Sequence, residues 1–252
     1  MRLTVIGSGT ISLSPTRGCA SYLLEAGDLR ILLDCGPGSA HTMARHGIDW
    51  WGITHVVLSH WHLDHIGDLP TLVFAWRHAR LEPRTAPLVI VGPAGTAALL
   101  GRWAEALGGW LAEPGFPLQV LEPGLEEPID LGSGVTLTSR SVPHTAESVA
   151  YSVGHDGRRL VYTGDTGHDP SLGAWAAGCD LLLAECSLPD AMPVPIHLTP
   201  SETAVLATAA APGMLVVTHM YPPLDGIDLR AELGARWTGP TVIATDGLVL
   251  DC

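Results

Sequence analysis

The chain has 252 residues, of which 46% are hydrophobic, so it is long and apolar enough to bury a sizeable core. Its formal net charge is −13, with 26 acidic residues against 13 basic ones, and all of the basic ones are arginine. A field of this sign repels polyanions, which argues against a sequence-blind nucleic-acid binder. It leaves room for a small anionic substrate held by metal ions, which are local charges of the opposite sign.

The cysteines and the apolar stretches indicate the compartment. Five cysteines without a CxxC spacing predict reduced, mostly buried thiols in the cytoplasm. The first apolar run ends at Gly7 and Ser8, which predicts a strand rather than a signal peptide. The longest apolar stretch, residues 204–217, is interrupted by Pro212 and Gly213, so we expect no membrane span.

Short apolar runs recur in chain order, and most are continuous, as in strands buried on both faces. The predicted strands are residues 3–6, 22–25, 29–34, 55–59, 88–91, 135–139, 149–153, 159–163, 181–184, 214–218 and 242–244. The predicted helices are residues 38–46, 69–80, 95–107, 200–210 and 229–234. For the fourth helix, Thr199 is the expected cap, Pro200 the first residue, and Glu202 the partner in a capping box.

This mixture of strands and helices predicts a layered α/β (α+β) fold. The stretch 108–128 is rich in Gly, Pro and Glu, and we expect it to connect two halves of the molecule.

The densest chemical signal is His-Trp-His-Leu-Asp-His, residues 60–65, directly after the predicted strand 55–59. Alternate residues of an extended chain share a face, so His60 and His62 can meet one ion. If the chain then turns, Asp64 and His65 can address a second ion. Zinc accepts imidazole nitrogen and carboxylate oxygen, so we favour a metal site over a His-rich surface turn that binds nothing.

Three more predicted strands lead to a single ligand-type residue, namely His144, Asp165 and His219. Each alone is ordinary for a cap or a turn. Functional groups of α/β sheets gather beyond the ends of strands, however, so the recurrence favours one shared site.

This pattern resembles the metallo-β-lactamase superfamily of hydrolases: HxHxDH, then a His, a Gly-Asp-Thr and a Thr-His, with a further match in the Asp-Cys-Gly turn at residues 34–36. The resemblance covers nearly the whole chain. It implies one domain, residues 1–252, folded as a four-layer αββα sandwich of two similar halves, about 1–120 and 121–252. It also implies two divalent ions, zinc first, with manganese or iron as alternatives. The implied ligands are His60, His62 and His144 for one ion, Asp64, His65 and His219 for the other, and Asp165 as a bridge.

Within the superfamily, the segment 181–187 and the element His-Leu-Thr at 197–199 are similar to the ribonuclease Z and phosphodiesterase branch. Carried over, His197 would protonate the leaving group and Glu185 would orient it; the alternative is a buried Glu and an ordinary loop His. The arm with which ribonuclease Z grips tRNA has no room between His144 and Asp165, so we expect no tRNA. The bridging Asp165 also speaks against an antibiotic-cleaving enzyme.

The sequence thus predicts a dinuclear metal-dependent hydrolase, most simply a phosphodiesterase in which a hydroxide shared by the ions attacks a small anionic substrate. Asp64, His197 and Glu185 are the expected catalytic residues. A carboxyl-ester, thioester or lactone hydrolase on the same metals stays open, as does a silent metal-binding or sensor module. The related branch also leads us to expect a homodimer. We expect Asp34, Ser59 and Thr163 to orient the ligands.

Overall fold

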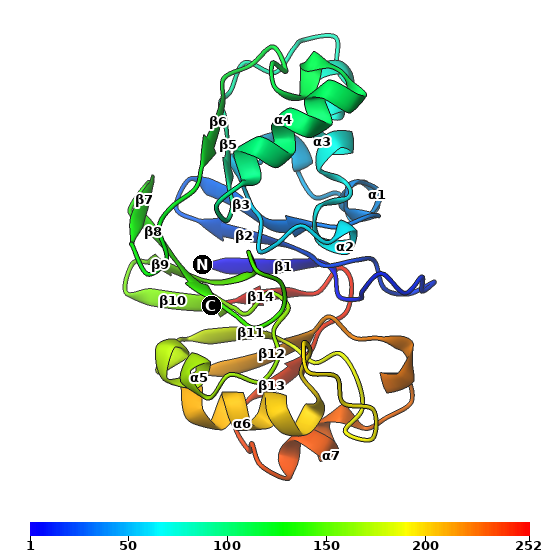
Figure 1. The fold of residues 1–252 in the computed structure, drawn as a ribbon, viewed down its shortest axis with the longest axis vertical. Coiled ribbons are helices and arrows are strands. Elements are labelled where there is room, and N and C mark those ends of the chain that lie inside the picture. Colours follow the sequence, from blue (N-terminus) through cyan, green and yellow to red (C-terminus); the bar gives the residue numbers. More distant parts are fainter.

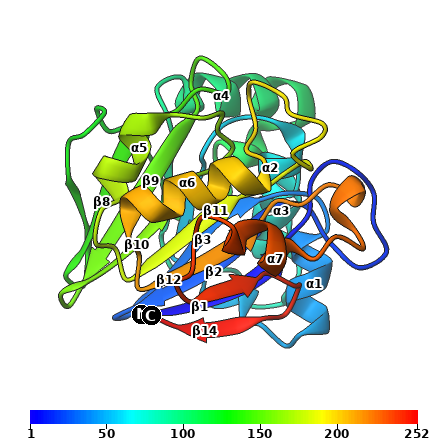
Figure 2. The ribbon, with the colours of Figure 1, turned by 90° about the horizontal axis from the view of Figure 1, so that it is seen from below.

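The computed structural model describes residues 1–252 and consists of two seven-stranded sheets packed face to face, each covered by helices on its outer face (Figure 1). The four layers confirm the predicted αββα sandwich. Seen from below, the N- and C-terminal ends lie side by side at one edge of the molecule (Figure 2). There the amino group of Met1 donates a hydrogen bond to the carbonyl of Cys252.

The first sheet has the order β14-β1-β2-β3-β4-β5-β6. Its strands are β1 (Arg2–Gly7), β2 (Ser21–Ala26), β3 (Leu29–Cys35), β4 (His55–Val57), β5 (Leu88–Val91), β6 (Leu118–Leu121) and β14 (Val249–Asp251). Pairing is antiparallel from β14 to β3 and parallel from β3 to β6. The final strand of the chain thus returns to the sheet in which the chain begins.

The second sheet has the order β13-β12-β11-β10-β9-β8-β7. Its strands are β7 (Ile129–Gly132), β8 (Val135–Ser141), β9 (Val149–His155), β10 (Arg158–Tyr162), β11 (Leu181–Glu185), β12 (Met214–Thr218) and β13 (Thr241–Ile243). Pairing is parallel from β13 to β10 and antiparallel from β10 to β7. Each sheet therefore combines a parallel part with an antiparallel part.

Helices α1–α4 cover the first sheet and α5–α7 the second (Figure 1). Their bounds are α1 (Ser39–Arg45), α2 (Leu63–Ile66), α3 (Leu69–His78), α4 (Thr96–Leu107), α5 (Pro170–Ala176), α6 (Pro200–Ala210) and α7 (Leu229–Gly234). The capping box predicted for α6 is present, with Thr199 and Glu202 in their expected roles. None of the helices combines the length and the hydropathy needed to cross a membrane.

Two apolar cores follow from the alternation of side chains along the strands. Tyr22 and Leu24 of β2 point into the core between the sheets, whereas Leu23 points into the core beneath α1–α4. The larger core continues under α5–α7. All five cysteines are free and four are buried, as predicted.

Three strands and two helices escaped the sequence analysis: β6, β7, β14, α2 and α5. β6 lies inside the stretch 108–128, so the interpretation of that stretch as a connection is wrong in part. β6 and β14 are edge strands with exposed or half-buried side chains, and hence lack the apolar runs of the inner strands. α5 does have a start signal, because Asp169 caps it and Pro170 is its first residue. The division into halves at residue 120 stays a prediction.

Candidate metal centre

The segment 60–65 makes the turn that a two-ion site requires. After β4, the chain runs extended as far as His62, whose φ and ψ are −63° and 144°. The short helix α2 then begins at Leu63 and carries Asp64 and His65. Because the backbone changes direction here, the first two histidines and the last two ligand-type side chains address neighbouring points.

The other three side chains follow strand ends of the second sheet. His144 comes after β8, Asp165 follows β10 through Gly164, and His219 follows β12 directly. Gly164 and His219 have positive φ, of 57° and 56°. A positive φ is uncommon for a residue with a side chain, so the bend at His219 is a strained backbone held by its surroundings.

The structure brings all seven side chains together in two neighbouring groups. The potential ligand atoms within each group lie within 4.8 Å of one another. The groups are His60, His62, His144 and Asp165 on one side, and Asp64, His65 and His219 on the other. We call the first three histidines the open set, because His62 is exposed, and Asp64, His65 and His219 the enclosed set, because all three are buried.

Asp165 connects the two sets through its two carboxylate oxygens. Oδ1 lies 3.2 Å from Nε2 of His65 and 3.3 Å from Nε2 of His219, both in the enclosed set. Oδ2 lies 3.7 Å from Nε2 of His144 and 3.9 Å from Nε2 of His60, both in the open set. One oxygen for each set is the arrangement of a bridging carboxylate.

Four of the five histidine rings are oriented by a hydrogen bond at Nδ1, which leaves Nε2 to face the centre of the group. The partners are Ser59 Oγ for His60 (3.0 Å), Asp34 Oδ2 for His65 (2.7 Å), the Ile196 carbonyl for His144 (2.9 Å) and Ser187 Oγ for His219 (3.0 Å). Such outer partners fix the ring and its tautomer in metal sites. His62 differs, since its Nδ1 faces the group at 3.0 Å from His144 Nε2.

Asp34 is the hub of this outer layer. Its carboxylate accepts hydrogen bonds from the backbone and hydroxyl of Ser59, from His65 and from the hydroxyl of Tyr162, each at 2.7 Å. Its own φ is 54°, a left-handed conformation that Asp tolerates better than most residues. Asp34 and Ser59 thus contact imidazole rings directly, as predicted for residues that orient the rings. The hydroxyl of Thr163 instead donates a hydrogen bond to the carbonyl of Gly164 and accepts one from the backbone N–H of Glu185.

The donor set fits divalent cations. His60 Nε2 and Asp165 Oδ1 are buried and have no hydrogen-bond partner, although buried polar atoms are normally paired. Both atoms face the centre of the cluster, where a cation would satisfy them. Imidazole nitrogens with carboxylate oxygens suit zinc, and they also accept manganese or iron.

The protonation of the cluster supports the same fit. Burial opposes charge on Asp165, but the His219 and His65 rings outweigh it and hold the pKa of that carboxyl well below its usual range. Burial likewise opposes charge on His65, but Asp165 and Asp34 raise its pKa well above the usual value. Burial lowers the pKa of His60, so this ring stays neutral. The buried anions therefore hold positive charge in place, and a metal ion would displace the proton of His65.

Beside the seven-residue cluster, His197 and Glu185 form a buried pair. His197 Nδ1 donates to Glu185 Oε1 at 3.1 Å, and it lies 4.0 Å from Asp165 Oδ2. Glu185 also accepts from the backbone of Thr166 and from the hydroxyl of Ser187. Burial lowers the pKa of His197, but the hydrogen bond and charge of Glu185 outweigh it, so the pKa is raised.

Ser187 and Tyr221 also lie at the site and had no role in the sequence analysis. Ser187 links Glu185 to His219, and it sits two residues after Glu185 in the segment that carries the resemblance. Tyr221 packs its ring against those of His197 and His219, with 6.0 Å between centroids in each case. Nothing in the local sequence around Tyr221 marks it, because only the strained turn at His219 brings it to the site.

Comparison with known proteins identifies the class. The model of the "Beta-lactamase superfamily domain" matches residues 29–220, so the chain belongs to the beta-lactamase superfamily. The chain is 30% identical to the ribonuclease Z of Mycobacterium bovis (strain BCG / Pasteur 1173P2), over 98% of this chain and 96% of that protein. It is 32% identical to an uncharacterized protein of Mycobacterium leprae (strain TN), over 100% of this chain and 88% of that protein.

Among solved structures, the metallo-beta-lactamase fold protein YhfI from Bacillus subtilis is similar, with a TM-score of 0.84, 24% identity and 99% of each chain covered. This likeness confirms the fold. Together with the relatives, it confirms the resemblance to the superfamily and to its ribonuclease Z branch. The protein is therefore a metallo-β-lactamase superfamily hydrolase, and the fold implies divalent metal ions.

Proposed function

We propose that this protein hydrolyses phosphodiesters with two divalent metal ions, one in the open set and one in the enclosed set, bridged by Asp165. The observation that carries the proposal is the division of the Asp165 carboxylate, with one oxygen facing each set. A ribonuclease Z at 30% identity supports phosphoester chemistry over carboxyl-ester chemistry. Zinc is the proposed ion, and a small anionic diester the proposed substrate.

Two divalent ions so placed would supply an activated water at neutral pH and stabilise negative charge on the attacked group. The chain's own contribution is to hold the donor atoms in register. Asp34, Ser59, Ser187 and the Ile196 carbonyl fix four imidazole rings before any ion arrives. Asp64 is held as well, because its Oδ2 accepts from the backbone N–H of Ile11 at 2.9 Å and lies 3.5 Å from His219 Nε2.

His197 is the proposed proton donor to the leaving oxygen. Its ring is close enough to Asp165 and His219 to be a further ligand by distance alone. Its Nδ1 is engaged by Glu185, however, so Nε2 is the nitrogen left to carry a proton. The raised pKa keeps that proton on the ring to a higher pH than in a free imidazole. Glu185 is then the positioning residue that sets the orientation of the ring and its charge.

The substrate is proposed to be small. Between His144 and Asp165 the chain forms the β9–β10 hairpin, which belongs to the second sheet. The net charge of −13 also disfavours a long polyanion. We therefore propose a diester smaller than tRNA, hydrolysed in the cytoplasm. Dimerisation stays a prediction.

Turnover of bis(p-nitrophenyl) phosphate by zinc- or manganese-loaded protein tests the proposal. We expect release of p-nitrophenolate well above that of metal-free protein. His197→Ala should slow turnover by about 10²–10⁴-fold, the usual worth of a general acid, while the metal content stays that of the wild type. Hydrolysis of a lactone or thioester panel with no diester turnover would instead favour the ester hydrolase. No hydrolysis of any substrate despite full metal loading would favour a silent module.

A further inference from the structure

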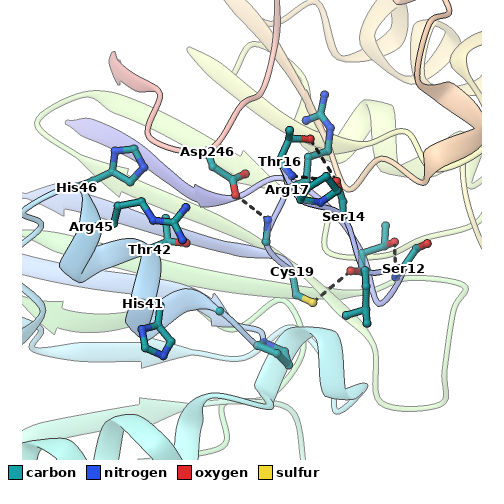
Figure 3. A pocket seen from close by; sticks show the side chains of 16 residues that line it. Ser12, Ser14, Thr16, Arg17, Cys19, His41, Thr42, Arg45, His46 and Asp246 are labelled. Carbon is teal, nitrogen blue, oxygen red and sulfur yellow. Dashed lines mark hydrogen bonds between the residues drawn. The ribbon is translucent and has the colours of Figure 1, made fainter.

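A second feature near the metal centre is a cavity of about 530 Å³ between α1 and the loop that joins β1 to β2. On one side α1 and the residue after it supply His41, Arg45 and His46 (Figure 3). On the other side the loop supplies a row of hydroxyls from Ser12, Ser14 and Thr16 (Figure 3). We call this space the basic cavity. The sequence analysis gave none of these side chains a role.

The charge of the basic cavity is opposite to that of the whole chain. The chain carries 26 acidic side chains, yet Asp246 is the only one that lines the cavity. Both carboxylate oxygens of Asp246 already accept hydrogen bonds, one from Ser8 and the other from the backbone N–H of Gly18. Arg45 forms no ion pair with a carboxylate; the arginines that do are Arg30, Arg140 and Arg158.

The basic cavity shares its wall with the enclosed set. Thr10 and Cys19 line it, and the next residue after Thr10, Ile11, donates its backbone N–H to Asp64. The thiol of Cys19 donates a hydrogen bond to the Thr10 carbonyl at 3.2 Å, which holds these two lining residues together. A group bound in the cavity would therefore be a neighbour of a substrate bound at the metal ions.

Guanidinium and several hydroxyl donors together suit a phosphate group, whose three terminal oxygens accept more hydrogen bonds than a carboxylate can. From the charge, the unpaired guanidinium of Arg45, the nearby hydroxyls and the shared wall, we infer that the basic cavity is a subsite for a second phosphate group of the substrate. The preferred substrate is then a phosphodiester that carries an additional phosphate. This inference rests on the proposed function for the first phosphate and on the basic cavity alone for the second.

A matched pair of substrates tests it: thymidine 5′-(p-nitrophenyl phosphate), and the same compound with a 3′-phosphate. In the wild-type protein the 3′-phosphate should lower KM about tenfold, the effect of one charge-assisted contact, with kcat unchanged. Arg45→Gln should abolish this advantage and leave the KM of the simpler substrate as it was. Arg102→Gln, on the exposed face of α4 and outside the cavity, is the matched control and should keep the advantage.

Binding to metal-free protein separates this inference from the proposed function. By calorimetry, thymidine 3′,5′-bisphosphate should bind the wild type more tightly than thymidine 5′-monophosphate, and Arg45→Gln should remove the difference. That result supports the subsite even if no diester is hydrolysed. Equal binding of the two nucleotides by the wild type, or a difference that persists in Arg45→Gln, would overturn it even if both substrates turn over.

Discussion

The open and enclosed sets differ in how the chain holds them. In the enclosed set, every side chain is buried; the His65 ring is fixed by the carboxylate of Asp34 at 2.7 Å, and the His219 ring by the hydroxyl of Ser187 at 3.0 Å. In the open set, the orienting partners are a hydroxyl and a carbonyl, both uncharged, and His62 is exposed. The second nitrogen of His62 makes no hydrogen bond within the chain.

This contrast shows how one cluster can hold a metal ion tightly on one side and leave a metal ion accessible to substrate on the other. A charged, buried partner makes an imidazole a better ligand and keeps it in place, so the enclosed set should bind its ion more tightly. An exposed ligand leaves its ion accessible to solvent, and therefore to substrate. The predictions below test whether the two sets are distinct and whether the contrast in their outer partners causes the difference.

The largest effect is expected for Asp165→Asn, because this carboxylate faces both sets with one oxygen each. Hydrolysis should fall by on the order of 10³-fold or more, since an outer partner alone is worth about 10–100-fold. Steady-state kinetics at saturating metal measure the loss. Asp169→Asn is the matched control: it lies four residues away and caps α5, a role that Asn fills equally well, so activity should be unchanged. Comparable losses in both variants would contradict a special role for Asp165.

A smaller effect is expected for Asp34→Asn, which removes the charge behind His65 but keeps the shape of the side chain. The affinity of the enclosed set should fall by about 10–100-fold. That of the open set should fall less, because Asp34 reaches His60 only through Ser59. Competition with a fluorescent zinc chelator measures both affinities. Tyr162→Phe removes one of the hydrogen bonds to Asp34 and keeps its charge, so its effect should be the smaller of the two. Equal weakening of both sets by Asp34→Asn would erase the contrast.

The smallest effect is a shift of the pH profile in Glu185→Gln. The pKa of His197 is raised from 6.5 because Glu185 outweighs the effect of burial, so the wild-type rate should fall as pH rises through that raised pKa. Without the Glu185 carboxylate, burial is opposed mainly by the charge of Asp165, so the pKa of His197 should fall and the alkaline limb of kcat/KM should move to lower pH. The folding stability from this pair is complete below pH 6.5 and lost as pH rises through the raised pKa. An alkaline limb that stays in place would show that His197 is not the group that titrates.

The sequence allowed the fold and the clustering of the candidate ligands to be predicted where the signal is local. Strands buried on both faces are continuous apolar runs, so β5 and β12 were predicted with their observed bounds. Four ligand-type residues within six positions after β4 are equally conspicuous. Their convergence with His144, Asp165 and His219 was predicted because strand ends meet at a common edge of the sheet.

The rest depends on contacts between distant segments. Ser187 is tied to His219, 32 residues away, and Tyr162 to Asp34, 128 residues away, and no local pattern encodes either pair. The edge strands β6 and β14 were missed because half-exposed residues carry no apolar run. The basic cavity was missed because its two walls, α1 and the loop before β2, meet only in the folded chain.

The number of zinc ions retained per chain, in the wild type and in two single variants, tests the central claim most directly. Elemental analysis after dialysis against zinc and then against buffer should find two ions in the wild type. His62→Ala should keep the ion of the enclosed set, and His65→Ala that of the open set, so each variant should retain one. A single ion in the wild type, or the same count in all three proteins, would contradict two ligand sets joined by Asp165.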